Sequence, residues 1–183
     1  MNELSLYILD LTQNSVTAGA KNIRITVEFD PESDNLTIII EDDGCGMDEA
    51  LLERVTSPFT TTRKTRKVGL GIPMIKQLCE MCEGTFQIES TVNVGTKLKL
   101  LFRSSHVDLP PMGDLPETFV ALINGTPEGI EFVLEYRKGQ EVFIFDTREI
   151  RQVLEGVMLN TPDVLMWIRE YISEGIREVN QVS

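Results

Sequence analysis

An acidic, glycine-rich turn at residues 41–47, with the sequence EDDGCGM, directly follows an apolar run. A carboxylate at the end of a buried strand, here that of Asp42, can accept a hydrogen bond from an exocyclic amine such as that of adenine. Gly44 and Gly46 let the backbone turn tightly and approach a ligand closely, and Met47 closes the motif. Taken alone, the pattern also fits a turn that binds nothing.

A second motif, KVGLGIP at residues 67–73, comes immediately before an expected helix. Free backbone N–H groups at a helix N-terminus bind phosphate. The basic side chains of residues 63–67 could neutralise that phosphate, although such a run is also typical of a solvated loop. The candidate phosphate contacts in this motif are Lys67, Gly69, Leu70 and Gly71.

Asp10 and Asn14 lie one turn apart on the polar face of an expected helix at residues 3–18. An amide oxygen can ligate Mg²⁺, a hard cation that takes waters and phosphate oxygens as its other ligands. A carboxylate one turn away could orient or deprotonate a nucleophile. The same face could equally be solvated and inert.

The elements that must position these motifs can be predicted from periodicity. Apolar and polar residues alternate in three segments, which predicts a sheet with one polar face, covered by helices on the other face only. A Pro- and Gly-containing segment at residues 105–117 is predicted to be a linker, and a second α+β unit is expected at residues 118–183. The expected helices are at 3–18, 48–55, 73–84, 117–123, from 147 and from 161; the expected strands include 22–30, 36–40, 130–136 and 141–145.

Composition narrows the class of protein. The chain has 183 residues, 42% hydrophobic and 25% charged, which is typical of a globular protein. Its net charge of −12 would repel a phosphate backbone, so nucleic acid is not expected as a partner. We expect neither a membrane span nor a signal peptide, and three cysteines do not suggest a disulfide scaffold. A cytoplasmic protein is therefore expected.

The order of the motifs resembles the superfamily of gyrase, heat-shock chaperone, histidine kinase and mismatch-repair ATPases. The matching segments are DLTQNSVTAGA, DDGCGM, SPFTTT, GLGIP and VGT, within about residues 1–104. The resemblance implies an α/β two-layer sandwich, with a mixed sheet covered by helices on one face, known as the Bergerat-type ATP-binding fold. A small α+β C-terminal unit would follow it. The implied cofactors are ATP and Mg²⁺.

The resemblance also implies roles for single residues. Asn14 looks like the Mg²⁺-binding asparagine and Asp42 like the adenine-recognising aspartate, while residues 57–71 are similar to the ATP lid of histidine kinases. Asp10, the expected catalytic residue, stands where many members carry a glutamate that is one methylene longer. The expected ATP-binding residues are Asn14, Asp42, Gly44, Gly46, Met47, Thr60, Thr61, Lys67, Gly69, Leu70, Gly71 and Thr96.

We therefore expect an ATP-binding domain at residues 1–104, a linker at 105–117 and an acidic C-terminal unit at 118–183. The leading hypothesis is a regulatory ATP-dependent protein, either a kinase acting in trans or a slow ATPase, similar to free-standing anti-sigma-factor serine kinases. The alternative is a non-catalytic, ATP-gated switch that binds a protein partner through the C-terminal unit, with a redox-sensing version. The oligomeric state stays open.

Three further features admit both a plain and a functional interpretation. Cys79 and Cys82 are expected to pack in the core, with a redox or metal site as the alternative. His106 is expected to be an exposed linker residue rather than a phosphate acceptor, because prolines soon follow it. Trp167 and Tyr171 are expected to be core or edge residues of the last helix.

Overall fold

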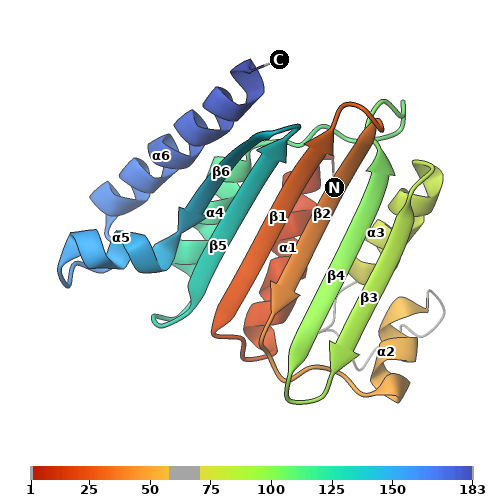
Figure 1. The fold of residues 1–183 in the computed structure, drawn as a ribbon. Coiled ribbons are helices and arrows are strands. Elements are labelled where there is room, and N and C mark those ends of the chain that lie inside the picture. The colour runs from red at the N-terminus through yellow and green to blue at the C-terminus, as the bar shows by residue number, and fades with distance from the viewer. Residues whose placement is uncertain (1, 58–70, 183) are drawn as a thin grey trace.

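The computed structural model describes residues 2–57 and 71–182. These residues contain a six-stranded sheet with the strand order β3-β4-β2-β1-β5-β6 (Figure 1). Neighbouring strands pair antiparallel except β1 and β5, which run parallel, so the sheet is mixed. The strands are β1 (Asn22–Asp30), β2 (Asn35–Asp42), β3 (Thr85–Thr91), β4 (Gly95–Arg103), β5 (Glu131–Lys138) and β6 (Glu141–Asp146).

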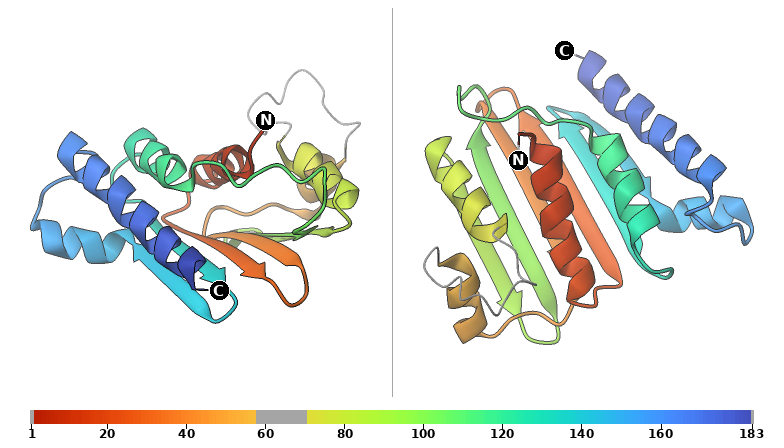
Figure 2. Two further views of the ribbon diagram at one scale, coloured as in Figure 1. Left: turned by 90° about the horizontal axis from the view of Figure 1, so that it is seen from above. Right: turned by 180° about the vertical axis from the view of Figure 1, so that it is seen from behind.

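Helices α1, α3 and α4 lie side by side against one face of this sheet, and the opposite face carries no helix among the described residues (Figure 2). Helix α6 packs against β5, β6 and α4, at the outer side of the molecule. The helices are α1 (Leu4–Thr17), α2 (Glu49–Thr56), α3 (Gly71–Met81), α4 (Leu115–Gly125), α5 (Thr147–Leu154) and α6 (Pro162–Gln181). The predicted two-layer α/β sandwich is confirmed.

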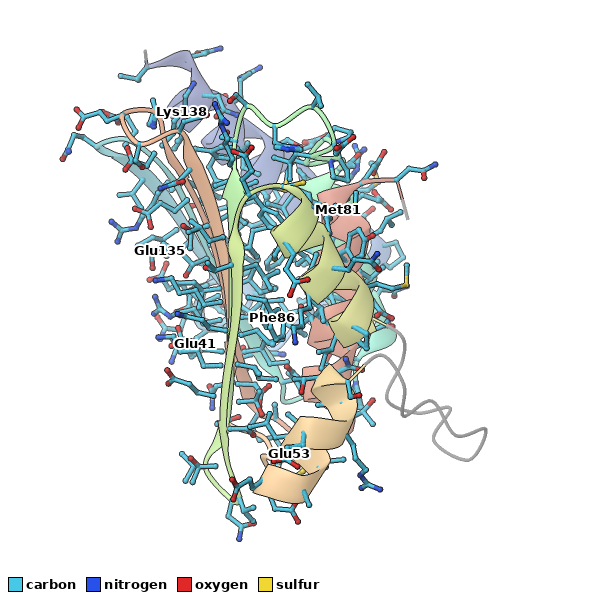
Figure 3. All side chains as sticks on the ribbon, turned by 90° about the vertical axis from the view of Figure 1, so that its right-hand side faces the viewer. Glu41, Glu53, Met81, Phe86, Glu135 and Lys138 are labelled. Atoms are coloured by element: carbon cyan, nitrogen blue, oxygen red, sulfur yellow. The ribbon has the colours of Figure 1, made fainter. Side chains whose placement is uncertain are left out.

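The core forms between the sheet and its helices because the strands alternate as predicted. In β1, Ile23, Ile25 and Val27 are buried, whereas the intervening Arg24 is exposed. Figure 3 shows the two sides: Phe86 points toward the helices, whereas Glu41 and Glu135 lie on the open face. Burying one face of each strand against apolar helix stripes stabilises both layers together.

The C-terminal unit continues the same sheet. β5 runs parallel to β1, with Ile23 opposite Phe132 and Ile25 opposite Leu134. The preceding segment crosses the N-terminus of α1, where the Leu4 N–H donates to the Pro111 carbonyl oxygen at 2.9 Å. The division into two domains and a linker stays a prediction, but the strands of both parts share one hydrogen-bonded ladder.

Most predicted element bounds differ from the structure by one to three residues. The strand predicted at 36–40 is longer and ends at Asp42, because β4 continues to pair with it as far as Thr96. Asp48 caps α2 as expected by accepting a hydrogen bond from the Leu51 N–H. Thr161 occupies the N-cap position of α6, but its side chain makes no capping hydrogen bond. Among the described helices, none has the length and apolarity that crossing a bilayer requires.

Candidate functional site

A cavity of about 240 Å³ opens between the C-terminal half of α1, the end of β2 and strands β3 and β4. Five of the residues predicted from sequence line it together: Asn14, Asp42, Gly46, Met47 and Thr96. Much of the remaining wall is apolar. It consists of Leu11, Leu51, Ile72, Ile88 and Leu98, with Ser15, Thr17, Ala18 and Cys45. Apolar walls with a few polar groups are typical of a site for a small organic ligand.

Among the described residues that line this cavity, Asp42 is the charged one, and two donors hold its carboxylate in place. The buried Ser15 hydroxyl donates to Oδ2 at 2.5 Å, and the Gly44 N–H donates to Oδ1 at 2.9 Å. A carboxylate oxygen has more than one acceptor site, so the group can still accept a hydrogen bond from a ligand. Gly44 therefore contributes by orienting Asp42, since it does not itself line the cavity.

Asp43, the neighbouring aspartate, has a structural role. Asp43 accepts hydrogen bonds from the backbone N–H groups of Lys21 and Asn22 and from the Asn22 side chain, at 2.8 to 2.9 Å. Burial by itself would raise the pKa of the Asp43 carboxyl, but these hydrogen bonds outweigh it and hold the pKa below its ordinary value. Asp43 thus ties the end of β2 to the start of β1, and this leaves Asp42 to face the cavity.

The turn after β2 is pinned to β3 by short contacts. Gly46 has a φ of +65°, and a Cβ at this position would lie 2.0 Å from the Thr91 carbonyl oxygen, so a side chain here would require the backbone to move. The Met47 N–H donates to the Ser90 hydroxyl at 2.8 Å. The Ser90 hydroxyl also lies 2.8 Å from that of Thr96. This network fixes the cavity wall that Met47 and Thr96 form.

Asn14 lines this cavity, and part of its amide has no partner among the described residues. Its Nδ2 atom is buried, and within the described residues it makes no hydrogen bond. A buried amide group without a partner costs free energy unless a ligand satisfies it. The orphaned amide therefore indicates that something other than the described part of the chain completes its hydrogen bonding.

Asp10 lies one helical turn before Asn14 and approaches the start of α3. A Cβ placed on Gly71 would lie 2.1 Å from the Asp10 Oδ2 atom, so the carboxylate occupies space that only a glycine leaves free. The structure thus brings the predicted catalytic residue and the first residue of α3 together. The other predicted lid contacts, Thr60, Thr61, Lys67, Gly69 and Leu70, lie outside the described residues.

Sequence reasoning missed Ser15 and Ser90, the two hydroxyls that organise the site. A signal for Ser15 was available: it continues the apolar stripe that Leu4, Ile8 and Leu11 form on α1, and a polar residue in a buried stripe needs a partner. No pattern in the sequence points to Ser90, because its role is to accept a hydrogen bond from Met47 in the turn after β2, which is distant in the sequence.

The cysteines pack as the plain interpretation expected. Cys79 and Cys82 are both buried in the core, and burial raises the pKa of the Cys79 thiol from 9.0 to about 12. No cluster of three metal-ligating side chains occurs in the described parts of the chain. A thiol with so high a pKa is a poor nucleophile at neutral pH, because the thiolate is the reactive form.

The expected exposure of His106 was wrong. Its side chain is only 16% exposed, and its Nδ1 atom accepts a hydrogen bond from the Asp108 N–H at 3.2 Å. The chain around it is ordered by Asp34, which accepts hydrogen bonds from the backbone and the hydroxyl of Ser105. A local turn therefore holds this histidine.

The profile of the family described as "Histidine kinase-, DNA gyrase B-, and HSP90-like ATPase" matches residues 2–106. This chain belongs to that family. The matched residues of this histidine kinase-like ATPase domain include α1, the turn after β2 and strand β4, the elements that form the cavity. The resemblance inferred from the motif order is confirmed.

Several relatives of this ATPase domain are sensor proteins. A candidate sensor protein of Shewanella frigidimarina (strain NCIMB 400) is 35% identical over 108 residues, which are 58% of this chain and 16% of that protein. The sensor histidine kinase YvrG of Bacillus subtilis (strain 168) is 28% identical over 98 residues, 51% of this chain and 17% of that protein. The chain therefore matches about one sixth of the length of these curated relatives.

A solved structure extends the likeness of the fold. The Aquifex aeolicus MutL ATPase domain complexed with ADP superposes with a TM-score of 0.50 at 14% identity, over 85% of this chain and 70% of that chain. At this identity the likeness shows the fold alone, which is the expected Bergerat-type sandwich. Because it covers more of the chain than residues 2–106, it includes part of the C-terminal unit.

Proposed function

We propose that the cavity binds ATP together with Mg²⁺, and that the protein is a regulatory ATP-dependent protein, a kinase acting in trans or a slow ATPase. The observation that carries the proposal is the Asp42 carboxylate, held by Ser15 and Gly44 in an otherwise mostly apolar cavity. A flat base with an exocyclic amine suits such a cavity, since its ring fits against apolar walls and its amine donates to Asp42.

Mg²⁺ fits the residues at the phosphate end of this site. The amide of Asn14 has a buried atom that lacks a partner in the described chain, and amide oxygens are suitable ligands for a hard cation. A 180° rotation of the Asn14 amide would place its oxygen where the orphaned Nδ2 atom lies. When bound, Mg²⁺ would neutralise phosphate charge and raise the electrophilicity of the terminal phosphorus.

The first turn of α3 supports binding of the terminal phosphate. Backbone N–H groups at a helix N-terminus favour an anion, and α3 begins at Gly71 beside Asp10. We propose that the Asp10 carboxylate accepts a proton from the attacking water or hydroxyl as that nucleophile approaches the phosphorus. The closeness of Asp10 to the helix start would place base and phosphate within one site.

Calorimetric titration of ATP with Mg²⁺ tests the binding step. Asp42→Asn removes the charged acceptor for the amine, so we expect affinity to fall by about 1.5–3 kcal/mol, or roughly 10- to 150-fold. Asp43→Asn is the matched control, because that carboxylate bonds to the β1 segment and faces away from the ligand. Equal ATP affinity for Asp42→Asn and the parent would reject the proposed role of Asp42.

Turnover is tested by following the γ-phosphate of labelled ATP, with and without cell lysate. Asp10→Asn should lower phosphate release or transfer by about 10²–10⁴-fold while ATP affinity changes little, because a general base acts on the reaction. Release or transfer above the no-protein control that is the same in parent and variant would remove Asp10 from the proposed chemistry.

An ATP-gated switch without turnover is the second candidate, and the topology favours it. β5 of the C-terminal unit pairs directly with β1, and β1 pairs with β2, the strand that ends at Asp42. A change at the nucleotide cavity could therefore reach the C-terminal unit through one continuous sheet. This candidate predicts negligible turnover in the parent, and partner binding that depends on ATP but not on its hydrolysis.

A further inference from the structure

The two edges of the sheet present different surfaces on the open face. β3 exposes polar side chains there, including Gln87 and Glu89, whereas β6 exposes Val142 and Ile144, which are 47% and 50% exposed. Within the described residues, each of these edge strands pairs on one side only. Proteins commonly blunt free edges with charged side chains, because an apolar edge invites another strand. The central positions of β6 lack that protection.

Helix α6 lies above this free edge in a defined orientation. On one flank Arg169 reaches toward α4, where its Nε donates to Glu117 at 2.8 Å. On another side the Tyr171 ring packs on Phe143 of β6, with ring centroids 5.6 Å apart. Gly175 makes this approach possible, since a Cβ there would lie 2.2 Å from the Phe143 ring. The flank of α6 that points away from α4 therefore faces outward beside β6, as Figure 1 shows.

That outward flank combines an aromatic stack with carboxylates. Trp167 and Tyr171 are stacked, with centroids 5.0 Å apart and planes at 12°, yet they are 46% and 41% exposed. Four exposed acidic residues share the flank, because residues three and four apart lie on one face of a helix. They are Asp163, Glu170, Glu174 and Glu178. In the described parts of the chain only Glu174 of these four is ion-paired, with Arg177.

We propose that the free edge of β6 and the outer flank of α6 together bind an extended, basic segment of a partner protein. The segment adds a strand to β6 through backbone hydrogen bonds, which is a common mode of peptide recognition. Its Lys or Arg side chains on the helix side meet the carboxylates of α6 and the face of the Trp167–Tyr171 stack. This goes beyond the proposed nucleotide chemistry and does not depend on it.

Charge argues for a basic partner rather than a second copy of this chain. A second copy paired along β6 would bring a second acidic edge next to the carboxylates of α6, since this strand begins at Glu141 and ends at Asp146. Each copy also carries a net charge of −12. The unpaired carboxylates beside the stack favour a cationic occupant instead.

Trp167 makes the surface directly observable, because the chain contains a single tryptophan. The probe is a short, end-blocked peptide of alternating lysine and valine, compared with a glutamate and valine peptide of the same length. We expect a saturable change in Trp167 fluorescence with the lysine peptide alone. We also expect slower hydrogen exchange at the β6 amides that face away from β5. No fluorescence change up to millimolar lysine peptide would overturn the proposal.

Two variants locate the binding. Glu170→Lys should weaken binding of the lysine peptide by about tenfold, and Ile144→Lys should weaken it similarly by placing a charge on the edge. Glu80→Lys is the matched control, since it makes the same charge change at an exposed position on α3, outside the proposed surface, and should leave affinity nearly unchanged. If Glu80→Lys and Glu170→Lys weakened binding equally, the binding would be non-specific charge attraction, and the proposal would be refuted. Analytical sedimentation could show that the protein is a dimer and that Ile144→Lys dissociates it. That result would mean that a second copy of the chain occupies this surface, which also refutes the proposal.

Discussion

Removing the Ser15 hydroxyl should damage the nucleotide cavity without touching any proposed ligand contact. In the folded protein this hydroxyl donates to the Asp42 Oδ2 atom at 2.5 Å, and Ser15 is only 4% exposed. Ser15→Ala leaves that oxygen without its buried donor and frees the carboxylate to rotate. The variant therefore tests whether the geometry of Asp42 is held by α1.

The size of the effect follows from the kind of hydrogen bond. A hydrogen bond to a charged group contributes about 1.5–3 kcal/mol. The lower end applies here, because the cavity can admit water that replaces the hydroxyl. A loss of about 1.5 kcal/mol lowers the Tm of a chain of this length by about 3–6 °C. If Asp42 must be reordered when ATP binds, affinity should fall by roughly the same free energy, or about tenfold.

The assay is thermal unfolding together with ATP calorimetry, and the chain supplies a matched control. Ser33 donates to the Asp30 carboxylate at 2.6 Å in an exposed turn, so Ser33→Ala should change the Tm by less than about 1 °C. In the Asp42→Asn background the effect of Ser15→Ala on affinity should shrink, because the two residues act through one bond. Equal losses for Ser15→Ala and Ser33→Ala, or unchanged ATP affinity in Ser15→Ala, would refute this reasoning.

Three other outcomes are expected. Gly46→Ala should destabilise the protein far more than Gly139→Ala. Both glycines have a positive φ, but of the two only the Gly46 Cβ would clash, at 2.0 Å from the Thr91 carbonyl oxygen. In urea unfolding, the control variant Gly139→Ala should cost about 1–2 kcal/mol. Burial raises the pKa of Cys79 from 9.0 to about 12, so as pH rises the thiol ionises in the unfolded protein before it does in the folded protein. The free energy of unfolding should therefore fall by about 1.4 kcal/mol between pH 8 and pH 10. This part of the loss should be absent in Cys79→Ala. Iodoacetamide at pH 8 should modify the exposed Cys45 and leave Cys79 unmodified in the folded protein, as mass spectrometry would show.

The sequence alone predicted most of the helices and strands and five of the residues that line the cavity. Alternation in residues 22–30 predicts β1 with its bounds, because a half-buried strand must alternate whatever it pairs with. The glycines of the turn after β2 predict a tight turn, and at Gly46 the positive φ and the close approach to Thr91 show why a side chain does not fit. Residues as distant as Asn14 and Thr96 were assigned to one site from motif order, and they line one cavity.

Only the tertiary structure decided which groups hold the site and how the two parts of the chain join. The motif singles out Asp42, but only the structure shows what holds the two neighbouring aspartates: Ser15 donates to Asp42 at the cavity, and Asn22 donates to Asp43 at the start of β1. No short segment of the sequence predicts the pairing of β5 with β1 either, because it joins residues about 110 positions apart in the chain. Such contacts depend on how helices and strands pack, and packing is a property of the whole chain rather than of its local periodicity.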